Sequence, residues 1–135
     1  MTSLVQEARN SVVVLHQLIE RIFNGSDHND DSLNLLLSSF HPDFRMVTSQ
    51  GKQLNLNETE ALFRRQYGQR EGIRIATSEY RVISQHEREV TIQYREIVMM
   101  EGINQSRLSL AILDYATAVP RWRFLQETLI ADAEV

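Results

Sequence analysis

The first third of the chain carries apolar side chains at the spacing of α-helices. Ser3 followed by Gln6 is a capping-box pattern, which marks the start of a first helix. Apolar residues then recur every three or four positions, at Leu4, Ala8, Val12, Leu15, Ile19 and Ile22. Asn24-Gly25 is a common helix stop. The pattern therefore predicts a long first helix with a single buried stripe.

Two shorter helices and a small hairpin are predicted next. The second helix covers the leucine-rich stretch from Leu33 to Phe40, and His41-Pro42-Asp43 ends it. Asn57 and Glu60 fit the N-terminal cap of a third helix, which Gly68 ends. The hairpin between these helices consists of a strand from Phe44 to Ser49, a turn at Gln50-Gly51-Lys52 and a return strand from Gln53 to Leu56.

The second half of the chain alternates between apolar and polar side chains, as strands do. Four such stretches follow one another, at Ile73 to Ser84, Val90 to Met100, Ser106 to Tyr115 and Arg121 to Ile130. Because short turns join them, we expect an antiparallel meander.

The stretch from Ser106 to Tyr115 is apolar on both of its faces. Leu108, Leu110 and Ile112 share one face, and Ala111 and Leu113 share the other. Such a strand needs cover on both sides, so we expect the helices on one face and a second copy of the chain on the other. Which face is which stays open, because a register error of one residue would exchange them.

Composition narrows the class of protein. The chain has 135 residues and a formal net charge of −4, which fits a single domain over residues 1–135 and makes nucleic acid an improbable partner. It contains no Cys, so a disulfide framework and a thiolate nucleophile are excluded. Glu7 and Arg9 precede a short apolar run, unlike a secretory signal, and nothing approaches a membrane span. We expect a cytoplasmic protein.

The order of elements resembles a known superfamily, and the phrases HPDFRMVTSQGK, TIQYREIVMMEG, RLSLAI and RWRFLQET carry that resemblance. The chain is similar to the nuclear transport factor 2-like, or SnoaL-like, superfamily of cystatin-like α+β cones. Trp122, Leu125, Glu127 and Thr128 look like the closing motif of an uncharacterised bacterial branch. The resemblance implies a strongly bent, mainly antiparallel sheet wrapped over about three helices, forming a half-barrel around a pocket, usually as a homodimer. Members range from isomerases, dehydratases and polyketide cyclases to non-catalytic domains, so function must come from the site.

Glu96 is the candidate polar anchor and the tentative catalytic residue. It shares a strand face with Tyr94 and with apolar residues. A carboxylate in such surroundings needs a partner or a raised pKa, and either state suits an acid or a base. A turn at Ile103-Asn104 would place Glu96 opposite Ala111 and leave Arg107 on the same face but two strand pairs away. The alternative is a structural ion pair or a solvated side chain at the sheet edge.

Further residues could line an apolar pocket beside Glu96. Strict alternation from an inward Trp122 places Phe124, Gln126 and Thr128 inside, and Leu125 and Glu127 outside. The ligand-binding candidates are Met46, Thr48, Phe63, Tyr67, Tyr94, Arg107, Trp122 and Gln126. For each apolar or aromatic candidate the alternative is plain core packing.

Other chemistries find little support. The segment from Asp27 to Asp31 resembles the start of a calcium loop, but Ser32 and Ser38 stand where that loop needs Gly and Glu. The four His residues lack metal-ligand spacing, and no glycine pattern fits a nucleotide, so we expect no metal and no cofactor. A cluster at Arg64, Arg65, Arg70 and Arg74 is either solvated surface or a site for an anion at the pocket mouth.

Three functions stay open from the sequence. The first is a small-molecule-binding domain with a mostly apolar pocket anchored by Glu96, and the second is an isomerase, dehydratase or cyclase that uses Glu96 as acid or base. Steroid isomerases of the superfamily place their catalytic Asp where this chain has Thr48, which counts against their mechanism. The third is a non-catalytic homodimeric association domain.

Overall fold

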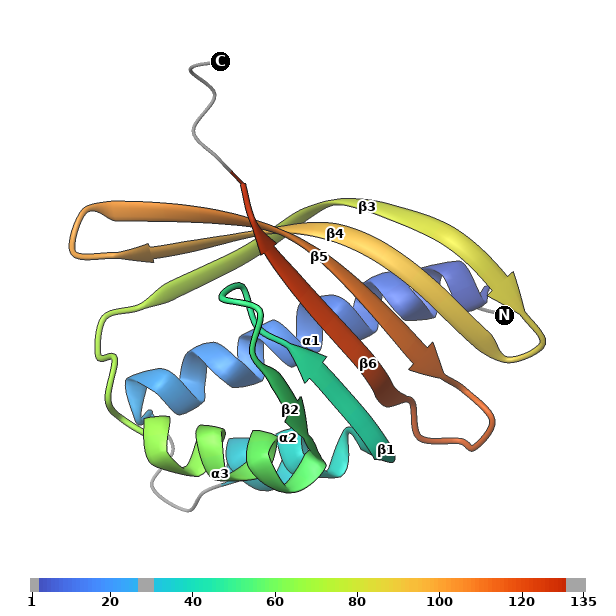
Figure 1. Ribbon diagram of the computed structural model, residues 1–135, viewed down its shortest axis with the longest axis horizontal. Helices are drawn as coiled ribbons and strands as arrows, with labels where there is room; N and C mark the ends of the chain where they lie inside the picture. Colours follow the sequence, from blue (N-terminus) through green and yellow to red (C-terminus); the bar gives the residue numbers. More distant parts are fainter. Residues whose placement is uncertain (1–2, 27–30, 131–135) are drawn as a thin grey trace.

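The computed structural model describes residues 3–26 and 31–130 (Figure 1). Residues 27–30, which include most of the calcium-loop-like segment, lie outside the described residues. The described residues form three helices, α1 (Leu4–Asn24), α2 (Asp31–Ser38) and α3 (Leu56–Gln66). They also form six strands, β1 (Phe40–Val47), β2 (Gln53–Asn55), β3 (Arg74–His86), β4 (Glu89–Met100), β5 (Ile103–Asp114) and β6 (Arg121–Leu129).

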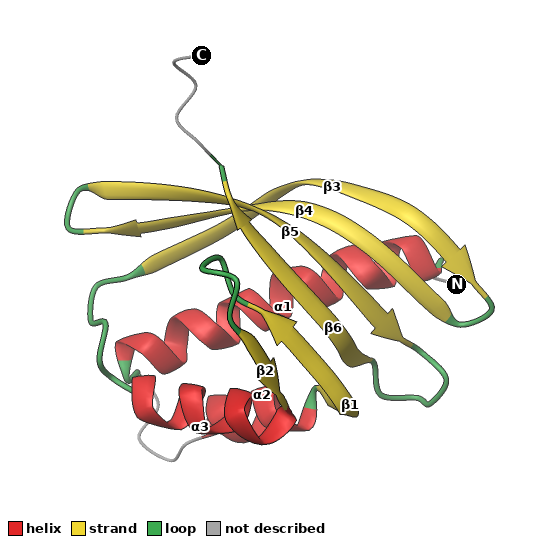
Figure 2. Cartoon of the chain, viewed as in Figure 1, coloured by secondary structure: helices red, strands yellow, loops and turns green. Residues whose placement is uncertain are grey.

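The strands form one bent, open sheet in the order β2-β1-β6-β5-β4-β3. Strand β1 runs parallel to β6, and the other neighbouring strands run antiparallel. The three helices lie on the concave face of the sheet (Figure 2). The α+β cone expected from the resemblance is therefore confirmed. None of the described helices combines the length and the apolar character needed to cross a membrane.

Helix α1 begins and ends where the sequence predicts. The Ser3 side chain accepts a hydrogen bond from the Gln6 N–H at 3.2 Å, and Gly25 ends the helix in the left-handed conformation, with φ 68°. A Cβ at Gly25 would come within 2.9 Å of the Gly68 Cα, so the end of α1 packs directly on the segment after α3. The Gly68 N–H also donates to the Ile22 carbonyl at 2.8 Å. These contacts fix the two helices that wall the site.

Two predicted boundaries are wrong. The His41-Pro42-Asp43 segment lies inside β1, because the register of β1 against β6 is irregular between Phe40 and Arg45 and Pro is tolerated there. Helix α3 starts at Leu56, two residues before the predicted start. Its capping box is therefore formed by Asn55 and Glu58, whose side chains each accept a hydrogen bond from the backbone N–H of the other. The predicted pair, Asn57 and Glu60, lies within the helix.

The turn between β4 and β5 falls at Glu101-Gly102, where we predicted Ile103-Asn104. Both turn residues have positive φ, 53° and 77°, which a tight hairpin turn requires and a β-branched Ile opposes. The register shifts by an even number of residues, so the strand faces stay as predicted. Glu96 becomes the direct cross-strand neighbour of Arg107.

The predicted alternation along β6 fails after Trp122. Trp122 pairs with Leu113 and Phe124 pairs with Ile112, so Arg123 is the extra residue of a β-bulge. Beyond the bulge the faces exchange. Leu125 and Glu127 are buried on the concave face, whereas Phe124, Gln126 and Thr128 lie on the convex face.

The structure also resolves the two faces of β5. Ala111 and Leu113 are fully buried in the core beneath the helices. Leu108, Leu110 and Ile112 point to the convex face, where Leu108 is 41% exposed. Within the described residues, no helix covers that face (Figure 2).

Candidate functional site

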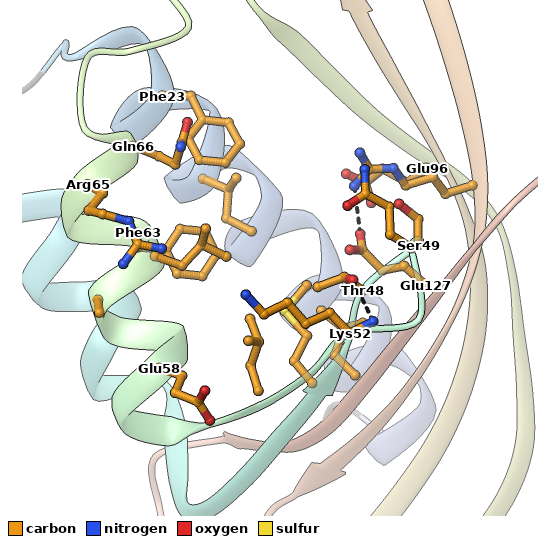
Figure 3. A pocket seen from close by; sticks show the side chains of 18 of the residues that line it. Phe23, Thr48, Ser49, Lys52, Glu58, Phe63, Arg65, Gln66, Glu96 and Glu127 are labelled. Carbon is orange, nitrogen blue, oxygen red and sulfur yellow. Dashed lines mark hydrogen bonds and ion pairs between the residues drawn. The ribbon is translucent and has the colours of Figure 1, made fainter.

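A cavity of about 630 Å³ lies between the helices and the concave face of the sheet (Figure 3). Its walls come from α1, α3, the β1–β2 hairpin and the strands β4, β5 and β6. Lys52 and Arg65 in its lining are exposed, whereas Glu96 and Glu127 are only 4% and 8% exposed. The cavity thus runs from an open mouth to a buried floor.

The side walls of the cavity are apolar. They are formed by Ile19, Phe23, Met46, Leu54, Leu62, Phe63 and Leu125. The Phe63 ring stacks on Phe23, with centroids 6.1 Å apart, and on Phe40 at 6.2 Å. These aromatic contacts hold Phe63 in place at the wall.

The floor of the cavity gathers four ionisable side chains from four elements. His16 comes from α1, Glu96 from β4, Arg107 from β5 and Glu127 from β6. His16 belongs to the apolar stripe of α1 and is 3% exposed. Burying so many charged groups costs stability unless they are paired and hydrogen-bonded, so their mutual contacts matter.

His16 links the helix to the sheet. Its Nδ1–H donates to the Val12 carbonyl at 2.8 Å, because a carbonyl can only accept. Its Nε2 lies 3.3 Å from the Tyr94 hydroxyl and 3.6 Å from Glu96 Oε2. Burial alone would lower the pKa of His16, but the neighbouring Glu96 raises it above its ordinary value of 6.5.

Arg107 lies between the two glutamates. It donates to Glu127 Oε2 at 3.0 Å and to the Gln105 side-chain carbonyl at 3.1 Å. It also faces Glu96 directly across the β4–β5 ladder. Within the described part of the chain, Glu96 Oε2 is buried without a hydrogen-bond partner. This oxygen is the one that faces His16 Nε2 at 3.6 Å, so the imidazole compensates its charge without a short hydrogen bond.

The environment moves the pKa values of the two carboxyl groups apart. Burial and then the negative charge of Glu96 raise the pKa of Glu127 to about 7, although Arg107 opposes this. Burial also opposes ionisation of Glu96, but His16 and then Arg107 lower the pKa of Glu96 to about 2. A proton is thus held at Glu127 beside an ionised Glu96, an arrangement that can donate to one ligand atom and accept from another.

Several predicted site residues line this cavity, namely Met46, Thr48, Phe63, Glu96 and Arg107. Whether they bind a ligand stays a prediction. Other candidates lie elsewhere. Tyr94 is fully buried against His16 behind the floor, and Tyr67 is the C-terminal cap of α3.

Two further ligand-binding candidates do not line this cavity. Trp122 lies on the concave face but lines a second cavity, of about 490 Å³, next to the N-terminal half of α1. Gln126 is exposed on the convex face because of the bulge at Arg123, so its predicted inward position is wrong.

Sequence reasoning missed His16 and Glu127. His16 lies four residues after Val12 and three before Ile19, so helical spacing alone places it in the buried stripe. The helical spacing in the sequence was therefore enough to identify His16 as a buried residue. Glu127 is a different case, because strict alternation from Trp122 points it outward and only the bulge turns it inward.

Comparisons with known proteins agree with this architecture. No family model matches the chain, and no curated protein matches it. Among solved structures, the chain is similar to a nuclear transport factor 2-like protein of unknown function from Pseudomonas aeruginosa, with 30% identity and a TM-score of 0.87. The match covers 92% of this chain and 98% of that one.

More distant structures share the fold alone. One is a nuclear transport factor 2-like protein from Cytophaga hutchinsonii, at 15% identity, with a TM-score of 0.66 and coverage of 90% of this chain and 98% of that one. Another is the β subunit of benzoate 1,2-dioxygenase from Burkholderia mallei, at 11% identity, with a TM-score of 0.67 and coverage of 94% and 93%.

Proposed function

The chain belongs to the nuclear transport factor 2-like family, and we propose that it binds a small, largely apolar molecule in the cavity above Glu96 and Glu127. The observation that carries this proposal is the form of the cavity. Its volume of about 630 Å³ falls within the usual range for ligand sites, apolar side chains form part of its walls, and ionisable groups gather at its buried floor. A cone filled by its own side chains, as the association-domain alternative requires, would leave much less space.

The floor suits one polar group of the ligand. Glu127, when protonated, donates a hydrogen bond to a carbonyl or hydroxyl oxygen. Because the surroundings are buried, a matched polar group gains more there than in water, and an unmatched one is rejected.

The proposal is tested with phenylnaphthylamine, a neutral aromatic dye that fluoresces in apolar sites. We expect saturable binding to the wild-type protein and a rise in its melting temperature, because the dye binds the folded state. Ala61→Trp places a large side chain at the cavity wall on α3 and should weaken binding at least about tenfold.

The matched control is Arg64→Trp, an exposed position on the same helix that does not line the cavity. It should bind the dye like the wild-type protein. The proposal fails if the dye does not bind, or if both Trp variants weaken binding equally.

The pKa of Glu127, which burial and the charge of Glu96 raise to about 7, suits a general acid and favours a second candidate function, an isomerase, dehydratase or cyclase. In such an enzyme Glu127 would protonate a carbonyl oxygen or a leaving hydroxyl while Glu96 removes a proton from carbon. The requirement is geometric. The substrate's acidic C–H must lie within reach of Glu96 while its oxygen lies beside Glu127.

We also propose that two copies of the chain pair through the convex face of the sheet. The apolar patch there is a row of Leu108, Leu110 and Ile112 along β5, with Ile97 and Phe124 near its two ends. Gln93, Arg95, Gln126 and Thr128 lie beside this row. A contiguous apolar patch on the surface of a folded domain is typical of a protein–protein interface. This arrangement leaves the cavity on the opposite face free.

A further inference from the structure

The mouth of the cavity carries positive charge. Three of its lining residues are cationic, namely Lys52 in the β1–β2 turn, Arg65 on α3 and Arg70 after it. Lys52 and Arg65 are exposed, and Arg70 is half-buried. These three cations are therefore less buried than the glutamates of the floor.

These charges are not neutralised by the protein. Among residues 3–26 and 31–130, none of the three cations takes part in an ion pair. Glu58 is the acidic lining residue nearest to them in the chain, and one of its carboxylate oxygens already accepts the Asn55 N–H at 3.1 Å in the cap of α3. Three cations beside one carboxylate leave an excess of positive charge, although the whole chain carries −4.

The cations are positioned against the apolar walls. In Figure 3, the Lys52 side chain extends from its turn toward α3, and Arg65 reaches from α3 beside Phe63. The turn itself is fixed, because the Lys52 N–H donates to Thr48 Oγ1 at 3.1 Å. The Arg70 guanidinium lies over the Phe23 ring, 5.5 Å from its centroid.

The ionisable groups of the floor, by contrast, are already paired with one another. Its one guanidinium, on Arg107, already donates to Glu127, and Glu96 is a carboxylate. His16 also faces Glu96 Oε2 at 3.6 Å, so each cation of the floor already lies beside a carboxyl group and none is unpaired. The cavity is therefore polarised, with its mouth suited to an anion and its floor suited to a neutral polar group.

We propose that the ligand is an amphipathic anion. Its anionic group, a carboxylate, sulfonate or phosphate, lies between Lys52 and Arg65, its apolar body packs on Phe23 and Phe63, and its far end presents a hydroxyl or carbonyl to the floor. This inference rests on the proposed function, because it specifies the ligand of the same cavity. The competing explanation for Arg65 is stabilisation of the C-terminal end of α3 by its positive charge.

The test compares two dyes with the same ring body. Phenylnaphthylamine is neutral, and anilinonaphthalene sulfonate adds one anionic group to it. The affinity of each dye is measured by fluorescence titration for the wild-type protein and for the double variant Lys52→Gln/Arg65→Gln. The control is Arg64→Gln/Arg74→Gln, which removes the same net charge from two exposed arginines outside the cavity lining.

We expect the sulfonate dye to bind the wild-type protein more tightly than the neutral dye. The Lys52→Gln/Arg65→Gln variant should lose about tenfold in affinity for the sulfonate, since each partly exposed cation contributes roughly three- to fivefold. Its affinity for the neutral dye should stay within about twofold, and the control should change neither affinity. Circular dichroism of each variant confirms that the fold is kept.

The outcomes separate the two proposals. If both dyes bind the wild-type protein but the Lys52→Gln/Arg65→Gln variant changes the two affinities by the same factor, the anionic ligand is contradicted. The binding function then still stands. The anionic ligand is also contradicted if the control weakens sulfonate binding as much as that variant does. If neither dye binds the wild-type protein, the binding function fails and the inference falls with it.

Discussion

At the scale of single residues, the ionisable groups at the floor of the cavity lower the stability of the fold but can serve a function. Glu96 and Glu127 are buried together, and Arg107 and His16 compensate part of the cost. Replacing such a cluster with apolar residues often stabilises a protein, so its presence beside a cavity favours a functional role.

The raised pKa of Glu127 makes stability depend on pH. The folded protein keeps this proton up to about pH 7, whereas the unfolded chain releases it near its ordinary value of 4.5. The contribution of Glu127 is therefore complete below pH 4.5 and is lost as pH rises to 7. The shift corresponds to a loss of about 3 kcal/mol over that window.

We predict that Glu127→Gln gains stability relative to the wild-type protein as pH rises from 4.5 to 7. Gln cannot ionise, so it avoids the cost that the wild-type carboxyl group meets. Urea denaturation across this pH range measures the difference in the free energy of unfolding between the variant and the wild-type protein. Glu79→Gln, which removes an exposed carboxylate paired with Arg95, should show no such drift. A gap between Glu127→Gln and wild type that stays constant with pH would contradict the raised pKa.

The contribution of Glu96 to stability changes with pH in the opposite direction to that of Glu127, and at lower pH. Its folded pKa of about 2 lies below its ordinary value of 4.5, so its contribution is present above pH 4.5 and is lost as pH falls toward 2. His16, whose pKa is raised, contributes below pH 6.5 and loses that contribution as pH rises further. Mildly acidic solution is therefore where the floor contributes most to stability.

At the scale of elements, local signals predicted helix ends well where one residue dominates. Ser3 and Asn24-Gly25 bound α1 as expected, because a side-chain cap and a left-handed glycine act within one turn. The start of α3 was misplaced because Asn55 and Asn57 both precede a Glu by three residues. The sequence offers two equal capping boxes, and tertiary packing selects the first.

The choice of cap can be measured. Asn55→Ala should lower the free energy of unfolding by about 1 kcal/mol, because the exposed N–H of Glu58 loses its acceptor. Asn57→Ala, within the first turn of α3, should change it by less than about 0.5 kcal/mol. Equal effects in urea denaturation would contradict the assigned cap.

Strand pairing was harder to predict than the strands themselves. The four long strands follow from alternation, but pairing depends on turn chemistry and on bulges. The positive φ of Glu101 set the β4–β5 register, and the bulge at Arg123 exchanged the faces of β6. Glu96 keeps the strand face that we predicted it shares with Tyr94, because the register error was even. Glu127 and Gln126 were not, because one extra residue reverses alternation.

At the scale of the whole molecule, the cone could be predicted because apolar patterning and element order are properties of the full chain. The cavity could not be predicted in the same way. Its floor joins His16 to Glu127 across more than one hundred residues of sequence, and each member comes from a different element. Such a meeting depends on three-dimensional packing that no local pattern encodes.

The convex face carries a prediction about assembly. Leu110 lies at the centre of the apolar patch on β5, so Leu110→Asp should convert a dimer into a monomer while leaving the core intact. Sedimentation velocity at micromolar concentration gives the mass of each form. Leu35→Asp, on an exposed site of α2, is the control and should stay dimeric. A wild-type monomer under these conditions would rule out the interface.

The central claim is that the cavity above Glu96 and Glu127 receives a small molecule. Nuclear Overhauser contacts between bound phenylnaphthylamine and the methyl groups of the protein locate the dye directly. We predict contacts to Met46, Leu62 and Leu125, which line the cavity, and their loss in Ala61→Trp. Contacts confined to Leu110 on the convex face or to Val14 in the second cavity would contradict the account.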